Sequence, residues 1–76
     1  MIIILKTLDG DSFELDVGVK DKLRVVKEKI FEQEGLFVEF LRLIFAGKEL
    51  EDEREVYEYG IQRESTIYIV FRHFSG

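Results

Sequence analysis

The chain has 76 residues, which is room for one domain with one hydrophobic core, because a chain of this size buries only roughly 60–65% of the surface that its unfolded form exposes. Hydrophobic residues make up 46% of the chain, which is typical of a globular domain and excludes a disordered one. The formal net charge of −5 argues against a nucleic-acid binder, which needs a basic face, and against an acidic partner.

Two residue types, cysteine and proline, are missing from the chain. Without cysteine there are no disulfides, thiolate metal sites or cysteine nucleophiles, and the redox compartment stays undetermined. Proline is also missing, although average usage predicts roughly four in this length, which is unusual for an evolved chain.

The longest apolar run, residues 1–5, is far too short to cross a bilayer, and no signal peptide precedes it. We expect a soluble, unsecreted protein without membrane contact, cytoplasmic if expressed in a cell.

The first segment is predicted to form a β-hairpin. Residues 1–7 are a β-branched and aliphatic run, and residues 12–17 alternate apolar with polar. The Asp-Gly step at residues 9–10 favours a tight turn, because glycine accepts a positive φ. Ile2 and Ile4 are expected to face outward. The side chains expected to share the inward face are Met1, Ile3, Leu5, Phe13, Leu15 and Val17.

A change of period predicts an amphipathic helix over residues 22–34. Its apolar positions fall within about 60° of one another at 100° per residue, and charged residues cover most of the remaining face. The apolar stripe consists of Leu23, Val26 and Ile30. Asp21 is the expected N-cap, and Gly35 lies where a left-handed residue ends a helix. Lys27 projects toward the apolar side, so we expect it to be partly buried beside a carboxylate.

The second half is predicted to add two or three strands. Residues 36–40 are too apolar for an ordinary loop, residues 41–45 form a third strand, and a short edge strand ends at Leu50. Residues 51–60 form an acidic connection, and residues 66–72 alternate as a long last strand. The expected inward anchors of these segments are Leu43, Val56, Tyr59, Ile67 and Ile69.

This order of elements predicts an α+β fold. A hairpin, a crossing helix and further strands make a mixed sheet with the helix on one face and solvent on the other. The first and last strands pair most simply as parallel neighbours at the centre. We find no internal repeat or linker, so we expect one domain over residues 1–76, with residues 72–76 as a flexible tail.

The residue inventory nearly excludes catalysis. The single histidine, His73, falls in the expected tail, where it could not be held as a general base or metal ligand. The acidic cluster at residues 51–58 lacks the ligand spacing of a calcium loop, and Gly47-Lys48 lacks the rest of a phosphate-binding loop. We therefore predict no enzyme activity, no cofactor, no metal and no small-molecule substrate.

The outward sheet face is the feature with functional content. Alternation points Ile44, Tyr68 and Val70 to solvent, and Leu8 joins them from the hairpin tip. A contiguous apolar cluster framed by cations is a candidate protein-binding site, although such a face can also be incidental or covered by a partner strand. The candidate face and its frame comprise Leu8, Arg42, Ile44, Gly47, Lys48, Tyr68 and Val70, with Lys6 and Arg72 at the margin.

Several segments resemble the ubiquitin family, and the resemblance runs along the whole chain without a gap. The segments that carry it are residues 6–8, 26–27, 29–30, 34–35, 42–48, 50–52, 61–62 and 64–66, with Gly10. The resemblance implies a β-grasp fold and a recognition face in which Leu8, Ile44 and Val70 match, while Tyr68 stands where the family has a histidine. It also implies lysines that carry chain linkages. The matching lysines are Lys6, Lys27, Lys29 and Lys48, whereas Asp11, Gln33 and Arg63 replace three others.

The tail departs most from the family pattern. Where the family ends in Arg-Leu-Arg-Gly-Gly, this chain has Arg72-His73-Phe74-Ser75-Gly76. Phe74 adds bulk and Ser75 adds a side chain where activating and cleaving enzymes thread a slender tail. The resemblance therefore predicts that conjugation through Gly76 fails.

The other differences leave three interpretations. Core positions change conservatively, and apolar residues replace prolines at Val19, Phe37 and Val38, a pattern typical of a designed protein. The first interpretation is thus a redesigned ubiquitin fold without native activity, retaining at most weak contact with ubiquitin-binding proteins. The alternatives are a variant selected to bind one ubiquitin-system enzyme, and a natural ubiquitin-like interaction domain. We expect a monomer with some risk of self-association through exposed phenylalanines.

Overall fold

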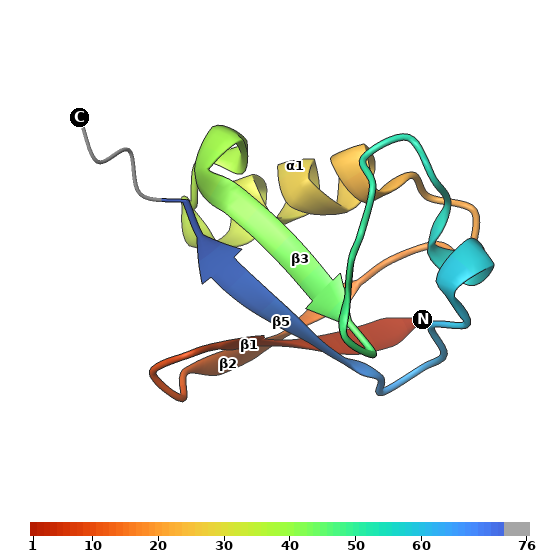
Figure 1. Ribbon diagram of the computed structural model, residues 1–76, viewed down its shortest axis with the longest axis horizontal. Helices are drawn as coiled ribbons and strands as arrows, with labels where there is room; N and C mark the ends of the chain where they lie inside the picture. The colour runs from red at the N-terminus through yellow and green to blue at the C-terminus, as the bar shows by residue number, and fades with distance from the viewer. Residues whose placement is uncertain (73–76) are drawn as a thin grey trace.

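The computed structural model, which describes residues 1–72, is a five-stranded sheet with one helix lying across one of its faces (Figure 1). The elements are β1 (Ile2–Thr7), β2 (Ser12–Asp16), α1 (Leu23–Glu34), the 3₁₀ turn η1 (Val38–Phe40), β3 (Leu41–Phe45), β4 (Lys48–Glu49), the 3₁₀ turn η2 (Val56–Tyr59) and β5 (Thr66–Phe71). The strand order is β2-β1-β5-β3-β4. β1 and β5 run parallel, and the other neighbours are antiparallel. The predicted α+β fold and its central parallel pair are confirmed.

The core lies between α1 and the inner face of the sheet. The helix contributes the three predicted residues, and β1, β3 and β5 contribute alternate residues, as the period of two requires. The buried apolar residues are Ile3, Leu5, Leu15, Val17, Leu23, Val26, Ile30, Leu41, Leu43, Leu50, Val56, Ile61, Ile67 and Ile69. Met1, Phe13 and Tyr59 pack against this cluster but stay partly exposed. Within residues 1–72, no helix is long and apolar enough to cross a membrane.

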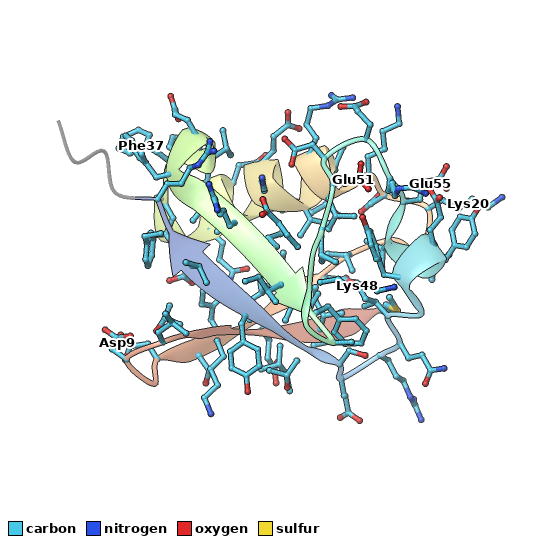
Figure 2. The ribbon with its side chains drawn as sticks, in the orientation of Figure 1. Asp9, Lys20, Phe37, Lys48, Glu51 and Glu55 are labelled. Carbon is cyan, nitrogen blue, oxygen red and sulfur yellow. The ribbon has the colours of Figure 1, made fainter. Side chains whose placement is uncertain are left out.

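Two 3₁₀ turns form in the segments that connect the long elements. η1 forms in the apolar segment after α1 and leaves its apolar side chains exposed, so Phe37 is 58% exposed at the end of the molecule opposite Lys20 and Glu55 (Figure 2). η2 lies in the acidic connection and is closed by a capping box between Glu55 and Glu58. Its anchor Val56 is fully buried, as predicted.

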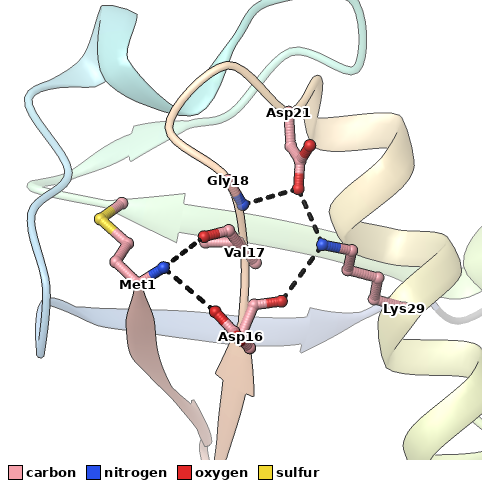
Figure 3. Close-up of polar contacts among 6 residues, drawn as sticks. All are labelled: Met1, Asp16, Val17, Gly18, Asp21 and Lys29. Atoms are coloured by element: carbon pink, nitrogen blue, oxygen red, sulfur yellow. Dashed lines mark hydrogen bonds and ion pairs between the residues drawn. The ribbon is translucent and has the colours of Figure 1, made fainter.

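The predicted cap of α1 is wrong. The N-cap position is Lys22, and no side chain caps the helix there. The carboxylate of Asp21 instead accepts hydrogen bonds from the Gly18 amide and the Lys29 ammonium, each at 2.8 Å (Figure 3). Lys29 also donates to the carbonyl oxygen of Asp16 at 3.2 Å. Asp21 therefore fixes the loop before the helix to the middle of the helix.

These bonds make the stability of the fold depend on the charge of Asp21. The hydrogen bond from Lys29, followed by that from Gly18, holds the pKa of Asp21 below its ordinary value. A carboxyl whose pKa is lowered by folding stabilises the fold above its unfolded pKa of about 3.9, and this contribution is lost as the pH falls through the folded-state pKa.

We expect Asp21→Asn to lower the free energy of unfolding by about 1–2 kcal/mol at pH 7, because the charge-assisted bond to Lys29 is weakened. Urea denaturation should show this difference shrinking steadily as the pH is lowered from 5 toward 2.5. Asp11→Asn is the matched control, since the Asp11 side chain lies exposed on the hairpin. A loss for Asp21→Asn that does not change with pH would contradict the role of the charge.

Candidate functional site

Three apolar side chains of the candidate face meet on the outer side of the sheet, away from α1. The register places Tyr68 of β5 between Lys6 of β1 and Ile44 of β3, and it pairs Val70 with Arg42. Ile44 and Val70 are half-buried, and Tyr68 is 43% exposed. The structure thus brings together the residues that strand alternation placed there.

The hairpin tip adds Leu8 to this face. Leu8 is 75% exposed, and together with Val70 it lines a hollow of about 350 Å³ between the tip and the end of β5. The other lining residues are Thr7, Asp9, Ile69 and Phe71. The Thr7 hydroxyl donates to the Asp9 carboxylate, which lowers the pKa of Asp9 and favours its charged form.

Strand alternation did not predict some of the residues that line this hollow. Thr7 is the last residue of β1, Asp9 lies in the turn that follows it, and Phe71 is the last residue of β5. The Thr-x-Asp spacing at the tip was the available signal, because a hydroxyl and a carboxylate two residues apart readily hydrogen-bond across a turn.

The cationic side chains expected around this face differ in how far they are buried and paired with carboxylates. Arg42 is half-buried, and its Nη1 lies 3.9 Å from the Glu49 carboxylate, at the limit of an ion pair. Its Nε is enclosed and has no hydrogen-bond partner within residues 1–72. Lys6 is exposed beside Tyr68 in the register. Lys48 is exposed too, but it pairs with Phe45, and Glu49 rather than Lys48 pairs with Ile44, so the register does not place Lys48 in the frame of the outer face as expected. Gly47, with φ of 78°, closes the turn that carries Lys48, as glycine does in such hairpins.

A model of the family described as "Ubiquitin family" matches residues 3–74. The chain belongs to the ubiquitin family. The match includes α1 and all of the five strands except the first residue of β1, so the predicted β-grasp fold and the family resemblance are confirmed together.

Relatives of this ubiquitin-family domain are of two kinds. The ubiquitin-like protein NEDD8 of Dictyostelium discoideum is 39% identical over 70 residues, which is 92% of this chain and 91% of that protein. Ubiquitin-like protein 1 of Schizosaccharomyces pombe is 37% identical over 70 residues, 92% and 90% of the two chains. The UV excision repair protein RAD23 homolog B of Bos taurus is 33% identical over 73 residues, covering 92% of this chain but only 18% of that protein. The fold thus makes up nearly all of some relatives and a small part of others.

The four lysines singled out in the sequence, Lys6, Lys27, Lys29 and Lys48, have different surroundings in this ubiquitin-family domain. The Lys27 ammonium lies 2.7 Å from the Asp52 carboxylate, and its side chain is 12% exposed, so its predicted burial beside a carboxylate is confirmed. Lys29 is held by Asp21, as described above. Lys6 and Lys48 are exposed and form no ion pair within the described part of the chain. Lys6 and Lys48 are therefore the more accessible of these four lysines.

Of the predicted tail, residues 72–76, only Arg72 is among the described residues, and its backbone amide donates to the Phe40 carbonyl oxygen at 2.7 Å. The other four, His73, Phe74, Ser75 and Gly76, lie outside the described residues. The expectations about the tail therefore stay predictions from the sequence.

Proposed function

We propose that the chain is a ubiquitin-like interaction domain that binds partner proteins through the outer sheet face and catalyses no reaction itself. The observation that carries this proposal is the adjacency of Ile44, Tyr68 and Val70 in the register of β3 and β5, beside the exposed Leu8. Apolar side chains that cluster in solvent within a polar rim are typical of protein-binding surfaces. Membership of the ubiquitin family supports the same conclusion.

The charge around this face favours a partner with carboxylates near its apolar contact residues. The net charge of −5 argued against such a partner, but that charge is unevenly distributed. In the register Lys6 lies beside Tyr68 and Arg42 beside Val70, whereas Glu49 lies beside Ile44 and five further carboxylates lie at residues 51–58. Binding responds to the local potential, so the net charge is a poor guide to the partner.

Titration of the fluorescently labelled chain with a set of ubiquitin-binding modules and deubiquitinases tests this function. Side chains that each contribute about 1–3 kcal/mol on burial leave only modest affinity after the costs of association, so we expect dissociation constants of about 100 μM to 1 mM. Tight binding to a single enzyme would instead indicate the selected variant. Absence of binding throughout the set would contradict the proposal.

We favour the natural ubiquitin-like domain among the three interpretations. Relatives 30–39% identical over most of their length support it, because the family relation accounts for the sequence without engineering. A redesigned ubiquitin stays a prediction from the exposed apolar residues and the missing prolines. Nothing in the structure explains why proline is missing.

We also propose that the chain is not conjugated through Gly76. Incubation with ubiquitin-activating enzyme and ATP should give no thioester, because Phe74 and Ser75 are larger than the residues that the family threads into that enzyme. The double variant Phe74→Arg, Ser75→Gly, which restores family residues, should gain thioester in the same assay. Robust thioester formation by the unchanged chain would overturn this proposal.

A further inference from the structure

A second apolar surface lies where the end of α1 meets η1. Phe31 of the helix and Phe37 before η1 are 44% and 58% exposed, yet their ring centroids are only 5.5 Å apart. Phe40 meets Phe37 edge to face at 6.4 Å. We call Phe31, Phe37, Val38 and Phe40 the aromatic cluster. Figure 2 shows Phe37 at the end of the molecule away from η2, on the helix side of the sheet.

The aromatic cluster borders a hollow of about 480 Å³. The apolar part of its lining is Phe31, Phe37 and Val38, and the rest is three glutamates: Glu28, Glu32 and Glu39. All three glutamates are exposed, and none forms a hydrogen bond or close ion pair with residues 1–72, although the charge of Glu28 contributes to raising the pKa of Arg24. Elsewhere in the described chain, carboxylates such as Asp52 and Glu53 pair with lysine or arginine. The hollow therefore combines an apolar lining with unpaired negative charge.

This combination selects one kind of occupant. An apolar side chain in the hollow would remove aromatic surface from water, and lysine or arginine beside it would meet the free carboxylates. Cations are also attracted to exposed aromatic faces. An acidic segment would place like charges next to the three glutamates. A neutral segment would cover the carboxylates without supplying a positive charge, which is also unfavourable.

We propose that the hollow at the aromatic cluster is a docking site for a short basic segment of another protein. The segment places one aromatic or aliphatic side chain against Phe31 and Phe37 and its lysines or arginines at the three glutamates. Lys6 and Arg42 lie beside the apolar residues of the outer sheet face, whereas this hollow is lined by three glutamates, so the two surfaces favour partners of different charge. One domain can then bind two different proteins.

The test uses the full chain, labelled with nitrogen-15, and the end-blocked peptide KKFKK as the probe. We expect shift changes confined to residues 28–40, and weaker binding as salt is raised, because screening acts on exposed charges. The peptides EEFEE and KKGKK, which lack the charge and the apolar side chain respectively, should cause no such changes. Equal binding of EEFEE, or no binding of KKFKK, would overturn the proposal.

Variants separate charge from apolar contact without disturbing the core. Glu28→Gln with Glu32→Gln should weaken KKFKK binding about fivefold, since each exposed ion pair contributes little alone. Phe37→Ser should abolish it. Tyr57→Ser is the matched control, because Tyr57 is an equally exposed aromatic residue, at 54%, on η2. A loss as large in this control would overturn the assignment of the site.

Two other occupants would also show in this experiment. Shift changes at residues 28–40 that grow with protein concentration, without peptide, would mean that a second copy fills the hollow. Binding of KKFKK that appears only after Phe74→Ala would mean that the chain's own tail fills it. Either result would overturn the proposal of a separate basic partner.

Discussion

Replacing Leu43 with alanine is expected to remove a large share of the stability of the fold. Leu43 is fully buried in β3 and pairs with Ile69 of β5 in the middle of the core. A leucine-to-alanine change at such a site costs about 3–5 kcal/mol, because it removes apolar contacts and leaves a cavity. A domain of 76 residues has a total stability of only about 4–11 kcal/mol. The single cavity therefore removes a large share of the stability.

Urea denaturation followed by circular dichroism measures this loss. The matched control is Leu8→Ala, the same substitution at a side chain that is 75% exposed, which should change the free energy of unfolding by less than about 0.5 kcal/mol. A loss below about 1 kcal/mol for Leu43→Ala would mean that helix and sheet do not enclose this residue.

The second large effect is expected on binding. Ile44→Ala should weaken binding of a ubiquitin-binding module at least tenfold, because Ile44 lies at the centre of the outer face beside Tyr68. Truncating a central contact residue costs about 1.5–3 kcal/mol, which is tenfold or more in affinity. Fluorescence anisotropy of the labelled chain measures the change, and urea denaturation checks that the variant is folded.

Ile2→Ala is the matched control for this variant. Ile2 is 40% exposed on the same outer face, but it lies in β1 beyond the last residue that pairs with β5. We expect its affinity to stay within about twofold of the unchanged chain. Similar losses in both variants would indicate a general effect on the sheet, and no loss in Ile44→Ala would place the contact elsewhere.

The helix and the long strands could be predicted because the spacing of their apolar residues differs between a helix and a strand. The spacing of Leu23, Val26 and Ile30 is compatible with a helix and not with a strand, and Ile67 and Ile69 show the opposite pattern. The start of α1 could not be predicted in the same way. A local cap and a tertiary contact compete for the Asp21 carboxylate, and the sequence does not show that Lys29 comes within 2.8 Å of it.

The outer face was largely predictable, and the aromatic cluster was not. Ile44, Tyr68 and Val70 lie on regular strands, where alternation decides which side they face. The contact between Phe31 and Phe37 depends on how the chain turns back after Gly35, which has φ of 75°. The apolar composition of residues 36–40 indicated exposed hydrophobic residues, but not that they would meet a helix residue across a turn.

The outer face is tested most directly by mapping where a partner binds. A ubiquitin-binding module is titrated into the nitrogen-15-labelled chain, and the amide shifts are followed residue by residue. We expect changes centred on Leu8, Ile44, Tyr68 and Val70, with little change on the helix side of the sheet. Changes centred on α1 or η2, or no change at millimolar partner, would contradict it.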